Sequence, residues 1–353
     1  MRRQKGPSKK PSTTVDLLAL AEIVERFEGK RVVILGDFVA DSFQYGNISR
    51  VSREAPVLIL RHRETRILPG GAANATNNFV ALGATAIPIS AVGDDEAGNW
   101  LLRVFREMKV NVSGILRVGG GTTPTKTRFL AGWTHTTAQQ VLRVDYEPQI
   151  SLPESHKKRI AKSLKSALKK TDALAISDYG FGTVTPETVR VALAEQKRNI
   201  PVTLDSRYHL QAFRQIGVTA ATPNEAEMEA AHNISIGQDL SALERCGRKT
   251  LRQMNLGSLV ITRGKDGMAV FQPRELTVHI AVHGSDQAVD VTGAGDTVLA
   301  AYTLGLASGA SPIEAAHIAN IAGGLVVMKR GTSTVSREEL LEAIRKAASE
   351  VAS

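Results

Sequence analysis

One glycine-rich octapeptide near the C-terminus has the residue types needed for chemistry on an anion. Its sequence is Asp290-Val-Thr-Gly-Ala-Gly-Asp296-Thr297, and a run of small residues with helical character follows it. A glycine-rich turn that leads into a helix directs free N–H groups and the positive end of the helix dipole at an anion. A carboxylate there repels a bound phosphate, unless it accepts a proton from a hydroxyl group that attacks the phosphorus. The octapeptide therefore predicts phosphoryl transfer with Asp296 as the base, and a carboxylate that only caps the helix is the alternative.

A second pair of residues has the oxygen donors that suit a metal ion. Asn224 and Glu227 lie three positions apart, so they share one face of a predicted first helical turn. Amide and carboxylate oxygens suit a hydrated Mg²⁺ whose coordination is completed by phosphates. The alternative is a polar first turn on a surface helix.

Small and polar residues in the N-terminal half form a further group of candidates. Gly70 and Gly71 precede a predicted helix, where the backbone approaches a ligand closely, and Asn74 follows with both a donor and an acceptor. Asp41 and Asp178 follow predicted strands, and the carboxyl ends of strands are where α/β sheets bind ligands. Aspartates in loops also form turns, which is the plain alternative for both.

These residues need elements that bring distant parts of the chain together. Short β-rich runs such as 32–35, 85–92 and 173–177 alternate with helical patterns such as 72–82 and 96–108. This alternation predicts a doubly wound α/β fold, in which a mostly parallel sheet carries helices on both faces.

Two stretches, at about 42–64 and 122–145, interrupt the alternation with pairs of β segments. They predict a small β-sheet that covers the main sheet as a lid, and ordinary extra edge strands are the alternative.

The octapeptide and Gly70-Gly71-Ala-Ala-Asn74 together resemble the two signatures of the ribokinase-like (PfkB) family of sugar kinases, from about residue 31 to 345. The resemblance implies a doubly wound domain with a small β lid, and ATP-dependent phosphoryl transfer to a sugar hydroxyl with Mg²⁺. It assigns the base to Asp296 and the anion hole to the N–H groups of Gly293, Ala294 and Gly295.

The same resemblance implies a nucleotide pocket and a sugar pocket. On the nucleotide side it places Asn224 and Glu227 at the Mg²⁺, and it lines the pocket with Thr262, Gly264, Gly267 and Asn320. On the sugar side it places Asp41, Gly70, Gly71, Asn74, Arg143 and Asp178. Activation by a monovalent cation is implied as well.

Several stretches are similar to one subfamily, which phosphorylates O1 of D-glycero-β-D-manno-heptose 7-phosphate in ADP-heptose biosynthesis. They include Arg50-Val-Ser-Arg-Glu-Ala-Pro56, Gln140-Val-Leu-Arg143-Val-Asp145 and Lys329-Arg-Gly-Thr-Ser-Thr-Val-Ser336. The subfamily's kinase is often half of a bifunctional protein, and the expectation here is a stand-alone kinase.

The chain departs from that subfamily at Ser42, Phe181 and Ser206, so two cations near the expected sugar pocket are missing. A substrate phosphate needs cationic or N–H partners, for which Lys126, Arg128, Arg143 and Arg207 are the candidates. A kinase for another sugar, phosphorylated or not, stays open, as does a non-catalytic protein that binds nucleotide or sugar.

The composition excludes several classes of protein. The 353 residues include 44 Lys and Arg, 35 Asp and Glu, and a single cysteine, Cys246, which cannot form an intramolecular disulfide. No apolar run approaches the ~20 residues that cross a bilayer, so we expect a cytoplasmic protein that needs no membrane. Residues 1–13 form a basic tail expected to be disordered, and residues 14–353 form the kinase domain. Contact of the tail with nucleic acid is the weaker alternative, and exposed edges of the lid strands favour a homodimer.

Overall fold

The chain folds into alternating strands and helices, and a computed structural model describes it at residues 15–133, 138–148, 152–194, 196, 198–284 and 288–352. The predicted basic tail, residues 1–13, lies outside the described residues. The helices are α1 (Leu17–Glu25), α2 (Ala72–Ala81), α3 (Glu96–Glu107), α4 (Glu154–Ala167), α5 (Pro186–Leu193), α6 (Glu225–His232), α7 (Leu240–Met254), α8 (Ala294–Ala307), α9 (Pro312–Val326) and α10 (Arg337–Ala352). The strands are β1 (Arg31–Gly36), β2 (Phe38–Val51), β3 (Leu58–Gly71), β4 (Thr85–Gly93), β5 (Ile115–Val118), β6 (Thr125–Gly132), β7 (Gln139–Tyr146), β8 (Ala173–Asp178), β9 (Val202–Ser206), β10 (Ala220–Ala221), β11 (Ser258–Thr262), β12 (Met268–Phe271) and β13 (Val278–Ile280).

The larger of the two sheets has the strand order β13-β12-β11-β10-β9-β8-β1-β4-β5. All neighbours from β11 to β5 pair in parallel, whereas β12 and β13 are antiparallel to their neighbours. Both faces of this sheet are buried, because alternate residues of β1 enter different cores. Val32 and Ile34 pack with α1, α2, α8, α9 and α10, while Val33 and Leu35 pack with α4, α5, α6 and α7. The predicted doubly wound α/β fold is confirmed.

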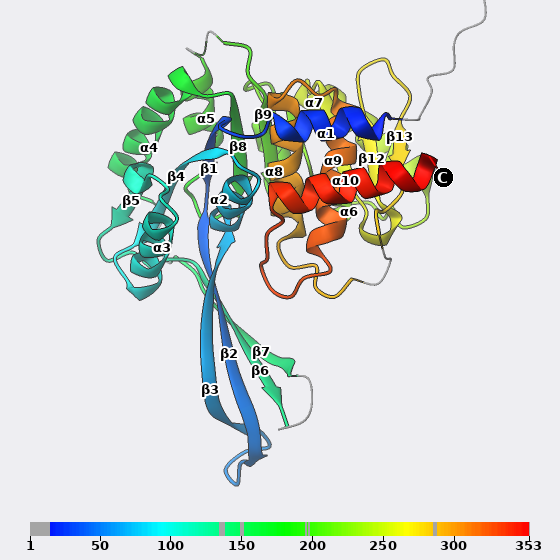
Figure 1. Cartoon of the computed structure of the whole chain (residues 1–353). Helices are drawn as coiled ribbons and strands as arrows, with labels where there is room; N and C mark the ends of the chain where they lie inside the picture. Colours follow the sequence, from blue (N-terminus) through cyan, green and yellow to red (C-terminus); the bar gives the residue numbers. More distant parts are fainter. Residues whose placement is uncertain are drawn as a thin grey trace, which may run out of the picture.

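The smaller sheet has the order β3-β2-β6-β7 and extends from the main body as a long arm (Figure 1). β2 pairs antiparallel with β3 and parallel with β6, and β6 pairs antiparallel with β7. The strands β2 and β3 are longer than predicted: β2 follows β1 almost directly, and β3 runs into α2. The root of this arm therefore lies at the carboxyl end of β1, beside the first turn of α2.

Several helix boundaries differ from those predicted. The sequence pattern also predicts a helix over 153–170, which is α4 followed by a short 3₁₀ turn at Leu168–Lys170. It predicts a second helix from Pro186 to about residue 197, and this helix ends at Leu193. Ser311 and Ser336, each with a glutamate three positions later, predict capping boxes, and both form. Each serine hydroxyl accepts the N–H of that glutamate, and the glutamate carboxylate accepts the N–H of the serine. Within the described residues, no helix is both long enough and apolar enough to cross a membrane.

Candidate active site

The glycine-rich octapeptide forms the turn into α8, with Gly293 as the residue that caps the helix. Gly293 has φ of 80°, and a Cβ at this position would collide with the side-chain amide of Asn74. The N–H groups of Gly293, Gly295 and Asp296 have no acceptor among the described residues, whereas the N–H of Ala294 donates to the Val291 carbonyl at 3.3 Å. Free amides at the start of a helix attract an anion, but the Ala294 N–H, which was predicted to belong to the anion hole, is engaged with Val291 in this structure.

The carboxylate of Asp296 lies at the same turn and is 2% exposed. Its Oδ2 accepts a hydrogen bond from Asn74 Nδ2 at 2.8 Å, and its Oδ1 accepts one from the Tyr179 hydroxyl at 3.2 Å. Burial raises the pKa of Asp296 to about 7, against the two hydrogen bonds, which lower it. A carboxylate with this pKa is suited to accept a proton near neutral pH.

Asn74 contacts the predicted base directly. Its Oδ1 accepts from Asn78 Nδ2 at 3.3 Å, and Asn78 Oδ1 accepts from the Thr297 hydroxyl at 2.8 Å. This buried network joins α2 to α8 and orients the Asn74 amide toward Asp296. Asn74 was predicted to bind the substrate, and the structure shows its donor already engaged with the carboxylate.

One cavity of about 360 Å³ brings together most of the predicted site residues. Among its lining are Asp41, Gly71, Arg143, Asp178, Asn224, Glu227, Thr262, Gly293, Gly295 and Asp296. Gly70 is not part of this lining, and a Cβ at its position would collide with the Asp41 carboxylate. The cavity lies between the root of the small sheet and the carboxyl ends of the central strands, as expected for a ligand site in this class of fold.

Several charged residues predicted to bind substrate are paired within the protein. Asp41 Oδ1 accepts from Arg128 at 2.6 Å in a mostly buried ion pair. Arg143 makes two hydrogen bonds to Asp145, at 2.8 and 2.6 Å. The oxygens of Asp178 accept from the N–H of Gly180 and the hydroxyl of Ser206.

Two cations of the same cavity lack such partners. Within the described residues, neither the Lys126 ammonium nor the Arg207 guanidinium makes a hydrogen bond or an ion pair. Lys126 Nζ lies 5.2 Å from the centre of the Tyr179 ring, and the Arg207 guanidinium lies 5.5 Å from that of Tyr208. Burial and the nearby Arg207 lower the pKa of Lys126. Two cations whose charged groups have no hydrogen-bonded partner favour an anionic ligand beside the carboxylate.

Asn224 and Glu227 form a capping box at the start of α6. Asn224 Oδ1 accepts the Glu227 N–H at 2.9 Å, and Glu227 Oε2 accepts the Asn224 N–H at 2.9 Å. The two residues thus cap the helix, and both side chains also line the cavity, together with Asp205. Burial raises the pKa of both Glu227 and Asp205.

These oxygens fit a hydrated divalent cation. Glu227 Oε1 makes no hydrogen bond within the described residues, and Asp205 adds a second carboxylate to the same wall. No group of three or more His, Cys, Asp or Glu side chains within the described residues could hold a metal ion. Ligands from outside the protein, such as water and phosphate oxygens, would complete the coordination.

A smaller cavity of about 180 Å³ adjoins the turn of α8 on its other side. It contains the four residues predicted for the nucleotide, Thr262, Gly264, Gly267 and Asn320, and its walls include Met268, Val282 and Val298. Asn320 Nδ2 donates to the Ala281 carbonyl at 2.8 Å, which leaves its oxygen for a ligand. An apolar slot lined by glycines suits a flat ring.

Sequence reasoning did not select three residues that contribute to this site. Asp205 lies at the end of β9, Tyr179 follows β8, and Asp37 follows β1. Each comes directly at or after the carboxyl end of a central strand, and that placement is the signal that could have identified them.

The family model of the pfkB family carbohydrate kinase matches residues 30–339. A curated relative from Geobacter sulfurreducens, the Bifunctional protein HldE, is 38% identical over 310 residues, covering 88% of this chain and 62% of the relative. The Bifunctional protein HldE of Mesorhizobium japonicum is 38% identical over 329 residues, covering 92% of this chain and 64% of the relative. The chain thus spans less than two thirds of these relatives.

Solved structures with the same fold are more distant in sequence. Phosphofructokinase-2 from Escherichia coli, in complex with potassium, superposes with a TM-score of 0.72 at 19% identity, covering 90% of this chain and 99% of that one. Arabidopsis thaliana ribokinase, complexed with ribose and ATP, superposes with a TM-score of 0.69 at 17% identity, covering 90% and 99%.

Proposed function

The chain belongs to the pfkB family of carbohydrate kinases, and on that premise we propose the donor and the acceptor of its phosphoryl transfer. The family membership predicted from the motifs is confirmed, so the protein is a phosphotransferase with a sugar hydroxyl as acceptor. We propose that ATP is the donor and that O1 of D-glycero-β-D-manno-heptose 7-phosphate is the acceptor. Residues 14–353 form the catalytic unit in this proposal, and the root of the small sheet, which lines the cavity, acts as its lid.

One observation carries the proposal: a carboxylate with a pKa near neutrality lies beside unoccupied helix N-terminal amides in one cavity. The acceptor hydroxyl gives its proton to Asp296 while its oxygen bonds to the γ-phosphorus. The bond from this phosphorus to the β,γ-bridging oxygen breaks, and ADP leaves with that oxygen. The N–H groups of Gly293 and Gly295 stabilise the charge on the transferring group.

We propose that Asn224 and Glu227 hold Mg²⁺, partly through water, because their oxygens line the cavity that contains Asp296. The ion supplies neutralising charge to the nucleotide phosphates when it is bound. Thr262, Gly264, Gly267 and Asn320 line the neighbouring slot, which we assign to the base of ATP. Activation by a monovalent cation stays a prediction from the resemblance.

The acceptor assignment depends on Lys126 and Arg207. These two unpaired cations lie in the cavity with Asp296, where a second phosphate on the substrate would neutralise them. The resemblance implies cations at positions 42 and 181, where this chain has Ser42 and Phe181, so Lys126 and Arg207 are our candidates for binding the phosphate. A sugar phosphate is therefore favoured over an unphosphorylated sugar.

We also propose that the protein is a homodimer. Two edge strands of the small sheet, β3 and β7, expose apolar side chains, with Leu58 46% and Leu142 55% exposed. Unpaired edges of this kind associate readily with a second copy. A cytoplasmic location stays a prediction from composition.

The test is ADP release by the purified chain with ATP and Mg²⁺, measured against a panel of acceptors. The panel contains D-glycero-β-D-manno-heptose 7-phosphate, the same heptose without phosphate, fructose 6-phosphate, ribose and fructose. We expect kcat/KM for the heptose phosphate to exceed that for the free heptose by about 100-fold, since hydrogen bonds to charged groups contribute about 1.5–3 kcal/mol each. The position of the new phosphate is then identified by ³¹P NMR of the product.

Preference for an unphosphorylated sugar would overturn the acceptor assignment and leave the kinase chemistry in place. If ATP binds but no acceptor of the panel supports ADP release, the result would instead favour a protein that only binds its ligands.

A further inference from the structure

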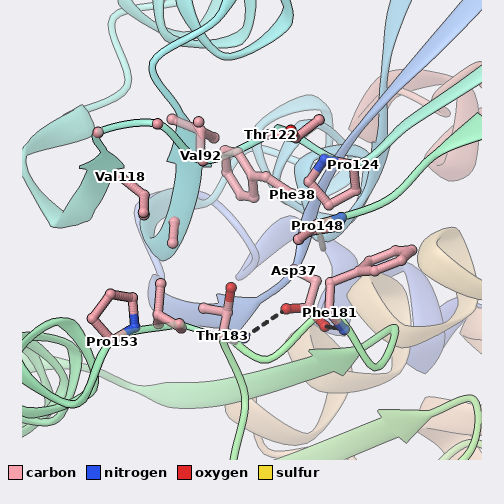
Figure 2. A pocket seen from close by; sticks show the side chains of 16 residues that line it. Asp37, Phe38, Val92, Val118, Thr122, Pro124, Pro148, Pro153, Phe181 and Thr183 are labelled. Carbon is pink, nitrogen blue, oxygen red and sulfur yellow. Dashed lines mark hydrogen bonds between the residues drawn. The ribbon is translucent and has the colours of Figure 1, made fainter. Parts of the chain in front are cut away.

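The loop from Asp178 to Thr183 lies between the active-site cavity and a second cavity of about 310 Å³. Tyr179 lines the first cavity, and Phe181 and Thr183 line the second, where Figure 2 shows them beside Asp37. We propose that Tyr179 is a positioning residue for the reaction: its hydroxyl holds the Asp296 carboxylate in place to receive the substrate proton, and Asp37 fixes the loop that carries it. This inference rests on the proposed function, because it presumes that Asp296 is the base.

Asp37 anchors the loop from the side of the second cavity. Its carboxylate is 1% exposed and accepts the N–H groups of Tyr179 at 3.0 Å, Phe181 at 3.1 Å and Thr183 at 2.9 Å. The bond to Thr183 is drawn in Figure 2. Burial raises the pKa of Asp37, although the bonds from the loop N–H groups counter this. One buried carboxylate thus fixes three backbone amides of a six-residue loop.

Asp178 provides a second anchor at the start of the same loop. Its Oδ1 accepts the N–H of Gly180 at 3.0 Å, and its Oδ2 accepts the hydroxyl of Ser206 at 2.7 Å. Gly180 has φ of 80°, a conformation that glycine adopts without strain. The backbone on both sides of Tyr179 is therefore held, so the position of its ring is determined by the loop.

The Tyr179 hydroxyl and the Asn74 amide hold Asp296 from two sides. Tyr179 bonds to Oδ1 at 3.2 Å and Asn74 bonds to Oδ2 at 2.8 Å, so the carboxylate plane is defined by both contacts. Burial and the charge of Asp296 raise the pKa of Tyr179 well above its usual value, so the phenol remains protonated and donates. A base held this firmly spends less time in orientations that cannot take the proton.

The test is the pH profile of kcat for Tyr179→Phe, which removes one oxygen and keeps the ring. With ATP and D-glycero-β-D-manno-heptose 7-phosphate, we expect kcat at pH 7 to fall about 10-fold with KM for ATP unchanged. The substitution removes a donor to the ionised Asp296 carboxylate, so the pKa of Asp296 rises and the acidic limb of the profile moves to higher pH. At pH values above the shifted limb, kcat of the variant should recover much of its loss.

A matched control is Tyr302→Phe, on the same helix as Asp296. The Tyr302 hydroxyl is buried and lies 2.7 Å from that of Ser258, so its removal tests the loss of a buried tyrosine hydroxyl away from the site. We expect this variant to lose stability without any shift of the acidic limb. Asp37→Asn, which weakens the anchor without touching the cavity of Asp296, should shift the limb in the same direction as Tyr179→Phe.

A second readout needs no substrate. The pH dependence of the free energy of unfolding contains the titration of Asp296, and its midpoint in Tyr179→Phe should move to higher pH than in the unmodified protein. If Asp37→Asn does not fold, the acidic limb of kcat and the unfolding midpoint of Tyr179→Phe are sufficient to test the inference.

An acidic limb and an unfolding midpoint that are both unchanged in Tyr179→Phe would overturn the inference, as would an equal shift in Tyr302→Phe. Asp296→Asn, measured in parallel, separates this failure from that of the proposed function. Turnover retained in Asp296→Asn overturns the proposed base and this inference with it, whereas an inactive Asp296→Asn beside an unshifted Tyr179→Phe overturns the inference alone.

Discussion

At the scale of a single residue, burial of Asp296 favours catalysis but opposes stability. A base for a hydroxyl group needs a pKa near the working pH, and burial provides this by disfavouring the charged form. The same burial destabilises the folded protein whenever the carboxylate is ionised. The hydrogen bonds from Asn74 and Tyr179 offset part of that cost.

The stability of Asp296→Asn should therefore depend on pH differently from that of the unmodified protein. The folded pKa of Asp296, about 7, is above its ordinary value of 3.8. The folded state thus binds more protons than the unfolded state between these two values, and stability falls as the pH rises through this window. Between pH 5 and pH 7 the titration of Asp296 should lower the free energy of unfolding by about 2–3 kcal/mol. Asp296→Asn should not show this pH-dependent fall. Urea unfolding at both pH values measures the difference, and identical pH dependence in the two proteins would contradict the raised pKa.

The unpaired cations provide the second prediction at this scale. Lys126→Gln and Arg207→Gln should each lower kcat/KM for the sugar phosphate by about 10- to 100-fold, since each removes a partner of one anion. The rate with the unphosphorylated sugar should change little. Lys162→Gln, on the exposed side of α4, is the matched control for the loss of one positive charge. Equal losses with both acceptors would show that these cations do not bind a second phosphate.

Sequence reasoning at this scale worked where a residue's type and motif defined its chemistry. It selected Asp296 and the glycines beside it because an acid next to an anion-binding turn is unusual. It selected Asn74 for the sugar, although the structure has the Asn74 amide bonded to Asp296. The pairing of Asp41 with Arg128 was also outside its reach, because these residues are far apart in the chain and meet only through the pairing of β2 with β6.

At the scale of elements, the turn into α8 depends on one backbone conformation. Asp290 connects this turn to the segment 329–336, since its carboxylate accepts the N–H groups of Thr292 and Gly331, each at 2.9 Å. Gly293 then adopts a positive φ beside Asn74. The free amides and the carboxylate are thus positioned by the same turn.

Gly293→Ala should damage both stability and activity. The positive φ costs roughly 1–2 kcal/mol for a residue with a Cβ, and the new methyl group would displace Asn74 from Asp296. We expect a loss of stability of this size and a fall in kcat of at least about 10-fold. Gly309→Ala is the control, because Gly309 has φ of 89° and open space around its Cβ position. A similar fall in kcat in both variants would mean that backbone strain alone explains the loss.

Most elements near the site could be predicted because their hydrophobic periodicity and their capping motifs are clear in the sequence. The strands before Gly36 and Asp178 are short and apolar, and the two C-terminal helices begin with capping boxes. α1 was not predicted, since its nine residues show little pattern of their own and are stabilised by packing in the core with α10. Helix propensity alone rarely determines whether such a short segment is helical, because most of its stability comes from tertiary contacts.

At the scale of the whole molecule, the larger sheet carries the site and the smaller one reaches away from it (Figure 1). The inner ends of β2, β3 and β6 contribute Asp41, Gly71, Lys126 and Arg128 to the cavity. The outer parts of the small sheet contact little else and expose apolar side chains such as Val141 and Leu142. An exposed sheet of this kind is expected to bind a partner surface.

Sedimentation velocity should therefore detect a dimer at micromolar concentration, and Leu142→Asp should shift it to the monomer. The reason is that a charge in an apolar interface is costly when it is buried without a partner. Leu240→Asp is the control, because Leu240 is 53% exposed at the start of α7, outside the small sheet. A monomer in the unmodified protein, or a dimer unaffected by Leu142→Asp, would contradict the proposed interface.

The fold class could be predicted from the alternation of strands and helices, whereas the length of the arm could not. The sequence predicted a pair of β segments within about 42–64, whereas β2 and β3 span 14 residues each and pair with two register shifts. Pairing over that distance depends on contacts between strands rather than on the local sequence.

The most direct test of the account is the turnover of Asp296→Asn with saturating ATP, Mg²⁺ and the accepted sugar. Asparagine keeps the size of the side chain but cannot take the proton, so we predict that kcat falls by about 10²–10⁴-fold. Calorimetric titration should find ATP affinity nearly unchanged. A variant that turned over the same sugar at the unmodified rate would contradict the assignment of the base, and with it the chemistry proposed for this cavity.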